Sequence, residues 1–156
     1  MARKGDTPEY VNRMQQEVFE VLAGAWSREY LRKIESKARQ IHRRYLDELD
    51  DADAKELDIN RRVSELDYSR RCAEASAVQA HMKQRLPLAP GMEIGYVVRD
   101  AHKWEVDPER TASKFDAAYY RGSLEKAWGE VEFVFKNQPE GFWNFSRFFI
   151  QSQHAL

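Results

Sequence analysis

Two stripes of apolar residues, each with helical spacing, dominate the first third of the 156-residue chain. The first stripe consists of Val11, Met14, Val18, Val21 and Leu22, and the second of Leu31, Ile34, Ala38, Ile41 and Tyr45. A spacing of three to four residues places each stripe on one face of an α-helix, and that face must be buried against another element. Because only a short linker around Gly24 separates the two helices, the sequence predicts an antiparallel helical hairpin.

Helix-start signals precede the first stripe. Asp6 is suited to cap a helix, Pro8 to its first turn, and Glu9 stands three residues after Asp6, as in a capping box. Gly24 weakens the helix near its end. The second helix is predicted from about Ser27 to about Leu49.

The rest of the chain mixes helices with short strands. Predicted in order are a solvated acidic loop to Asp58, a strand within 57–64, a helix from about Asp67 to Arg85, a turn at Pro87, Pro90 and Gly91, a strand over 93–99, a loop broken by Pro108, and a long helix from about Asp116 to Phe135. The predicted fold class is α+β and mainly helical. The hairpin and a small helix/strand subdomain form one domain over residues 1–137, and residues 138–156 form an aromatic C-terminal tail.

Bulk composition excludes several classes of protein. Hydrophobic residues make up 42% of the chain and charged residues 33%, which fits a globular protein and not a disordered one. Cys72 is the only cysteine, so there is no internal disulfide and no multi-cysteine metal site. No apolar run approaches the roughly 20 residues of a membrane span, and the N-terminus lacks a targeting segment. We therefore expect a cytoplasmic protein without a membrane partner.

The net charge of −1 conceals a segregation of charge along the chain. Residues 28–44 are mostly cationic, whereas residues 47–58 carry one lysine among seven acids. Any nucleic-acid contact must therefore depend on local patches.

Catalytic and metal-binding patterns are missing from the sequence. His42, His81, His102 and His154 occur singly, without the paired spacing that places two ligands on one metal, and each is expected to be exposed or half-buried. The acids around Asp51 lack the glycine and glutamate of a calcium loop, and no glycine-rich phosphate loop is present. We expect no catalytic residue, no metal ligand and no cofactor in this chain.

A cluster of basic and hydroxyl residues is the best candidate binding site. Its members lie on the predicted strand and at the start of the following helix: Arg61, Arg62, Ser64, Tyr68, Ser69, Arg70 and Arg71. Guanidinium groups, hydroxyls and a helix N-terminus all bind phosphates. The alternative is a solvated ionic surface in which these arginines pair with Glu65, Asp67 and Glu74.

The order of these motifs resembles the thumb domain of archaeal family B DNA polymerases. The matching features are the basic strand ending in Ser64, Tyr68 at the start of a helix with Ala77, the Pro90-Gly91 turn followed by Ile94 and Tyr96 to Val98, and Asp116 followed by Tyr119 and Tyr120. The segment from Arg3 is similar to the one that enters the first thumb helix, so the resemblance covers residues 3–135. Ser69 stands where the family usually has a lysine.

The resemblance implies a non-catalytic role, because the palm motif with its metal-binding aspartates is absent. Some archaeal family B polymerases are split, with the thumb and C-terminus on a small second polypeptide, and a chain that starts at Met1 resembles such a subunit. A large catalytic subunit with Mg²⁺ would then perform nucleotidyl transfer. This chain, an accessory subunit of the nucleoid-associated enzyme, would grip primer–template DNA.

The C-terminal tail is rich in aromatic residues that suit an interface: Trp143, Phe145, Phe148 and Phe149. Archaeal replicative polymerases commonly end in a sliding-clamp-binding box, and Phe145, Phe148 and Phe149 match its last three positions, although Phe142 replaces its glutamine. The tail is expected to bind the clamp, the large subunit, or its own domain. Two rival functions stay open: a protein that tethers a replication partner to the clamp, with incidental DNA contact, and an independent nucleic-acid-binding module.

Overall fold

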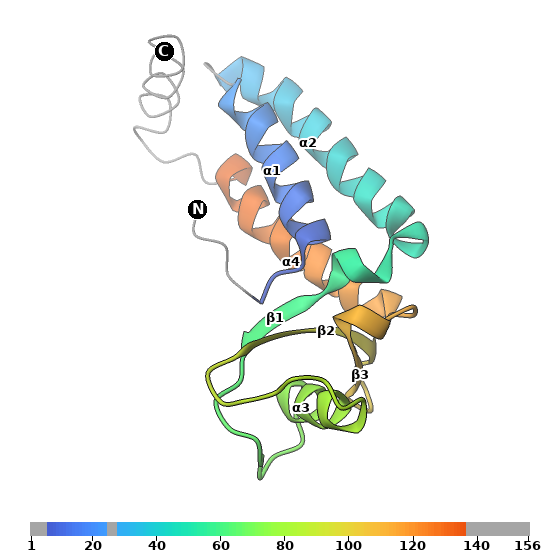
Figure 1. The fold of residues 1–156 in the computed structure, drawn as a ribbon. Coiled ribbons are helices and arrows are strands. Elements are labelled where there is room, and N and C mark those ends of the chain that lie inside the picture. The colour runs from blue at the N-terminus through green and yellow to red at the C-terminus, as the bar shows by residue number, and fades with distance from the viewer. Residues whose placement is uncertain (1–5, 25–27, 137–156) are drawn as a thin grey trace, which may run out of the picture. The chain divides into compact units, whose positions relative to one another are not determined.

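The computed structural model describes residues 6–24 and 28–136. Within these residues the chain forms four α-helices and three β-strands (Figure 1). The elements in order are α1 (Glu9–Ala23), α2 (Arg28–Glu48), β1 (Ile59–Arg62), α3 (Ala73–Lys83), β2 (Glu93–Asp100), β3 (Glu105–Pro108) and α4 (Ala117–Lys136). The predicted mainly helical α+β class is confirmed.

The described residues divide into two compact units. Unit 1 holds residues 6–11 and 50–120, and unit 2 holds residues 12–24, 28–49 and 121–136. The predicted boundary at residue 137 stays a prediction, because the tail lies outside the described residues.

Unit 2 is a helical unit built on the hairpin of α1 and α2. Both predicted stripes point inward: Met14, Val18 and Ala38 are fully buried, and Leu31 is 1% exposed. The helix α4 contributes Leu124, Trp128 and Val131 to the same core. Removing these side chains from water supplies the main free energy that holds the three helices together.

Unit 1 contains an antiparallel sheet in the order β1-β2-β3, with α3 packed against β2 and β3. Strand β1 pairs with β2 so that Ile59 faces Tyr96, and β3 pairs with β2 so that Val106 faces Val98. Pro108, expected to break a loop, instead ends β3 opposite Tyr96. A proline fits there because a terminal position of an outer strand needs no ladder donor.

The start of α3 was predicted wrongly. The expected helix from Asp67 begins only at Ala73, and residues 67–72 form bends and irregular backbone. None of these six side chains is buried, so no packing offsets the entropy of winding them into a helix. The alanine-rich segment that follows buries Ala75, Ala77 and Val78, and the helix begins with it.

The acidic stretch between α2 and β1 is more ordered than predicted. It contains two short 3₁₀ turns, Leu49–Asp51 and Ala54–Leu57, which bury Leu49, Ala54 and Leu57. Asp53 caps the second turn, its Oδ1 accepting from the Lys55 amide at 3.0 Å. The acids stay at the surface while these apolar side chains anchor the connection.

Among the described residues, none of the helices combines the length and the apolar character that a bilayer crossing requires.

Candidate nucleic-acid interface

Strand β1 presents two consecutive arginines at its end. Arg61 and Arg62 follow Ile59 and Asn60, and side chains alternate between the two faces of a strand. Arg61 therefore shares the face of the buried Ile59, and Arg62 lies on the opposite face. Both guanidinium groups are exposed, because the strand ends where the sheet meets solvent.

Arg61 is held by acids from two other segments of unit 1. Its Nη2 lies 3.5 Å from Oδ2 of Asp6, and its Nε lies 3.6 Å from Oε1 of Glu74 at the start of α3. These distances are long, and the Arg61 side chain is 44% exposed, so the ion pairs contribute little to stability. Burial raises the pKa of Tyr96 to about 12, and the charge of Arg61 beside that phenol opposes the rise.

Atoms of Arg61, Arg62 and Tyr68 line one shallow depression over Val63 and Ile94, at the end of β1 where the two arginine side chains leave the strand on opposite faces. The depression, formed by described residues of unit 1, is shallow and is not an enclosed cavity. Arg62 faces Glu93 across the ladder, yet no ion pair joins their side chains in the described structure. A shallow basic surface of this kind suits a partner that lies on it from outside.

The hydroxyl residues of the cluster are only partly brought together. Ser64 Oγ and Tyr68 Oη lie 3.2 Å apart, at an exposed position beside the end of β1. Both oxygens can donate to a phosphate. Ser69 is exposed and makes no described contact with them.

The predicted role of a helix N-terminus stays a prediction, and the helix start lies later in the chain than expected. Ser69, Arg70 and Arg71 precede the first turn of α3, and the helix is capped by Cys72, whose Sγ accepts from the Ala75 amide at 3.4 Å. Arg71 turns away to donate to the Lys103 carbonyl at 2.6 Å. Arg70 is exposed.

The alternative prediction, that the arginines of the cluster pair with nearby acids, holds for one arginine. Of the acids proposed as partners, Glu74 pairs with Arg61, whereas Glu65 and Asp67 form no ion pair with the cluster in the described structure. Arg62 and Arg70 thus keep their charge uncompensated.

The paired tyrosines at the start of α4 are structural. Tyr120 is fully buried, and its hydroxyl accepts the Val98 backbone N–H at 2.8 Å. Burial also raises the pKa of Tyr119, which packs edge to face on Tyr120 with ring centroids 5.1 Å apart. Asp116 accepts from the Ala101 amide at 2.9 Å and the Tyr119 amide at 3.1 Å, and the first of these bonds is the main reason that its pKa is lowered.

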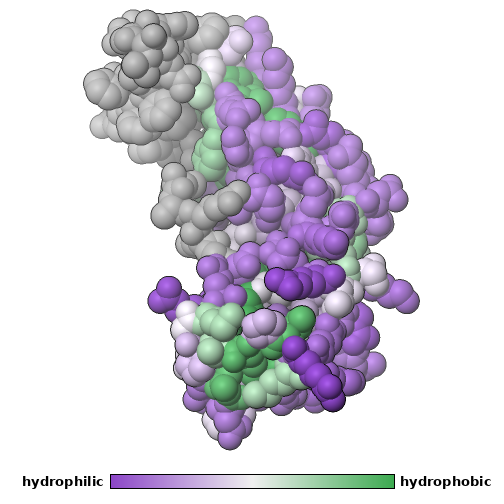
Figure 2. Space-filling view, viewed as in Figure 1, coloured by the Kyte–Doolittle hydropathy of each residue, from purple (hydrophilic) through white to green (hydrophobic). Residues whose placement is uncertain are grey.

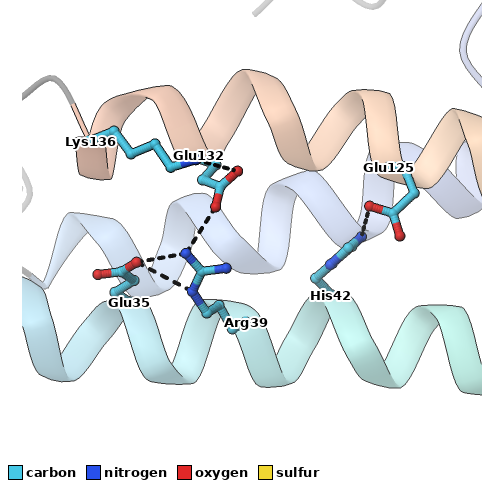
Figure 3. Close-up of polar contacts among 6 residues, drawn as sticks. All are labelled: Glu35, Arg39, His42, Glu125, Glu132 and Lys136. Carbon is cyan, nitrogen blue, oxygen red and sulfur yellow. Dashed lines mark hydrogen bonds and ion pairs between the residues drawn. The ribbon is translucent and has the colours of Figure 1, made fainter.

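Sequence reasoning missed a buried histidine in unit 2. His42 and, in unit 1, His81 were expected to be exposed or half-buried, but both are buried, at 9% and 6% exposed. The His42 ring stacks on Trp128, with ring centroids 4.9 Å apart. Its Nε2 lies 3.6 Å from Oε2 of Glu125 (Figure 3). Burial lowers the pKa of His42, more than the nearby Glu125 raises it. The available signal was the spacing of His42, which lies four residues after Ala38 and three before Tyr45, both members of the predicted stripe.

Arg39 joins α2 to α4 beside that histidine. Its Nη2 bonds Glu35 Oε1 at 2.8 Å and Glu132 Oε1 at 2.9 Å (Figure 3). Its guanidinium carbon lies 5.5 Å from the centre of the Trp128 ring. Glu132 also binds Lys136 at 3.3 Å. This network fixes the registration of two helices and leaves Arg39 committed within the unit.

No group of three or more histidines, cysteines or acids able to hold a metal ion occurs in the part of the chain that the structure describes. The predicted partner-binding residues Trp143, Phe145, Phe148 and Phe149 lie outside the described residues.

Comparison with known proteins gives one informative result. No protein-family model matches the chain, and no curated protein matches it. In fold it is similar to part of the family B DNA polymerase from the hyperthermophilic archaeon Pyrobaculum calidifontis, with a TM-score of 0.64 over 78% of this chain. The two sequences are 21% identical, and the matched region spans 17% of that polymerase. The chain thus has the fold of a region of a family B polymerase.

Proposed function

We propose that this chain is a non-catalytic thumb subunit of a split family B DNA-directed DNA polymerase. In this role it holds primer–template duplex by its phosphate backbone. A large catalytic subunit, carrying the Mg²⁺-binding carboxylates, performs nucleotidyl transfer. The aromatic tail serves as the contact to that subunit or to the sliding clamp.

One observation carries the proposal: a fold similar to a polymerase region presents uncompensated arginines beside a strand end. Arg62 and Arg70 are exposed without an ion-pair partner among the described residues, and the Ser64–Tyr68 hydroxyl pair lies next to Arg62 in sequence and space. Guanidinium and hydroxyl groups are standard donors to phosphate oxygens, and such contacts fix the position of a duplex without reading its sequence.

The geometry also ranks the four arginines. Arg61 and Arg71 already interact with Glu74 and the Lys103 carbonyl, so binding a phosphate requires them to exchange partners. Arg62 and Arg70 need no such exchange. We expect Arg62 and Arg70 to contribute more to affinity for duplex than Arg61 and Arg71.

A salt titration of duplex binding tests this ranking. Each phosphate contact adds about 0.9 to the slope of log affinity against log salt concentration, so the double variant R62Q/R70Q should lower the slope by about 1.8. The matched variant R61Q/R71Q should lower it less. Equal, unchanged slopes in both variants would remove this surface from the DNA interface.

Primer extension tests the catalytic assignment. We expect no synthesis by the purified chain with Mg²⁺ and dNTPs, and synthesis when its co-purifying partner is added. A partner without polymerase activity, together with partner binding that survives high salt, would favour the tether function. DNA affinity with no partner requirement would favour an independent nucleic-acid-binding module.

A further inference from the structure

A second basic surface lies on α2 in unit 2, whereas the arginine cluster belongs to unit 1. Its unpaired cations are Arg32, Lys33, Lys37 and Arg43, all of them exposed. The side of α2 visible in Figure 2 is mostly hydrophilic. The proposed function does not use this surface, so it calls for a separate explanation.

Helical geometry places these four cations on one outward arc. At about 100° per residue, Arg32 and Arg43 fall within about 20° of each other on one edge of the arc. Lys33 and Lys37 lie about 40° apart on the other edge, at least about 80° away from the first pair. The buried stripe, represented by Ala38, lies on the opposite side of the helix. The cations thus form two rows that flank the exposed face.

Few acids lie near these rows: the exposed Asp47 follows Arg43 by four residues and falls between the rows, but no ion pair joins the two side chains in the described structure. Glu35 is the only acid between residues 32 and 44, and it pairs with Arg39 at 2.8 Å. Arg44 is paired with Glu17. The four cations of the two rows have no carboxylate partner among the described residues, so their charge faces solvent.

The chemistry between the two rows favours a nucleic acid over a protein. Ser36 and Gln40 are exposed there, and both can donate to phosphate oxygens. The arc carries no exposed aromatic or large aliphatic side chain between residues 32 and 44. Protein interfaces are centred on such apolar anchors and are depleted in lysine, whereas nucleic-acid interfaces are polar and strongly positive.

We infer that the outer face of α2 is a second duplex-DNA-binding surface, at which Arg32 with Arg43 and Lys33 with Lys37 contact phosphates on the two sides of a groove. An α-helix with its side chains is about 10–12 Å across, and the major groove of B-DNA is about 12 Å wide. Along the axis, Arg32 and Arg43 are about 16 Å apart, which spans several phosphates of one strand. The surface binds DNA without sequence preference, because its charged side chains contact only the phosphate backbone.

The test is the salt dependence of binding to a blunt-ended duplex of about three helical turns, followed by fluorescence anisotropy between about 50 and 200 mM salt. The variant R32Q/K33Q/K37Q/R43Q removes four charges while glutamine keeps a helix propensity close to that of lysine and arginine. If all four residues contact phosphates, the slope of log affinity against log salt should fall by up to about 3.6. A charge-preserving variant, R32K/K33R/K37R/R43K, should keep the slope.

A matched control separates a local site from a general loss of charge. The variant K55Q/K114Q/R121Q/K126Q also removes four exposed cations but leaves the face of α2 intact. The inference is supported if only the α2 variant lowers the slope. An equal fall in both four-charge variants, or no fall in the α2 variant, overturns it, and the latter result would fit an acidic protein partner instead.

The same titration keeps this inference distinct from the proposed function. The R62Q/R70Q variant probes unit 1, and the α2 variant probes unit 2. Loss of slope in the α2 variant alone would support the second surface while contradicting the thumb assignment of the arginine cluster. A lower slope in the R62Q/R70Q variant alone would support the arginine cluster of the thumb assignment and contradict the second surface.

Discussion

The hydroxyl of Tyr120 provides a direct test of how unit 1 is held together. Its oxygen accepts the buried Val98 N–H of β2 at 2.8 Å, and the ring is fully buried beside Phe115 and Tyr119. The substitution Tyr120→Phe keeps the ring but removes the acceptor, so the Val98 amide loses its partner without gaining access to water. A buried donor left unsatisfied costs about 1–3 kcal/mol.

We expect Tyr120→Phe to lower the free energy of unfolding by that amount and the melting temperature by about 3–10 °C. Urea unfolding followed by circular dichroism gives the free energy, and amide hydrogen exchange at Val98 gives the local effect. Tyr68→Phe is the matched control, because the Tyr68 hydroxyl bonds Ser64 at an exposed position, where removal should cost no more than about 0.5 kcal/mol. Equal losses in the two variants, with unchanged exchange at Val98, would refute the reasoning.

Two further predictions concern titrating groups. Burial lowers the pKa of His42 below 6.5, so the folded chain resists protonating it, and unfolding free energy should fall as pH drops below about 6.5 and level off below the folded-state pKa. The variant His42→Phe keeps a ring against Trp128 but cannot be protonated, so urea titrations across this pH range should show a smaller fall of its unfolding free energy. The same pH slope in the variant and the wild type would contradict this role of His42. Asp116→Ala should cost about 0.5–2 kcal/mol in thermal unfolding at neutral pH, since it removes the cap of α4. Because the Asp116 pKa is lowered from 3.8, the stability that this carboxylate contributes is present above pH 3.8 and is lost as the pH falls through its folded-state pKa. If the variant lost stability in acid as steeply as the wild type, Asp116 would not have this role.

Periodic burial explains what the sequence predicted well. The stripes of α1 and α2 carry enough apolar residues at one spacing that only a helix can bury them together, and Met14 and Leu31 are indeed buried. The strand β2 was predicted equally well, because Ile94 and three β-forming residues after it follow directly on a Pro-Gly turn. Gly91, at φ 87°, occupies the conformation that a glycine adopts most easily.

Local sequence signals did not predict the elements whose formation depends on tertiary contacts. Strand β3 has only four residues and ends in Pro108, and it forms because β2 offers it a partner. The start of α3 depends on which side chains find a core, and the segment around Arg70 finds none. The sequence predicted the arginines as candidate site residues, but it could not show that Asp6 and Glu74, distant in sequence, pair with Arg61 and not with Arg62.

In the order β1-β2-β3, the strands β1 and β3 are edge strands, and each has features that disfavour pairing with a further strand. β1 has only four residues and ends in two arginines, and β3, equally short, ends in a proline that lacks an N–H. Short strands with charge or proline resist edge-to-edge pairing between molecules. The guanidinium groups of Arg61 and Arg62 therefore serve solubility as well as any ligand, and hydrophobic replacements at these two positions would favour aggregation of the chain.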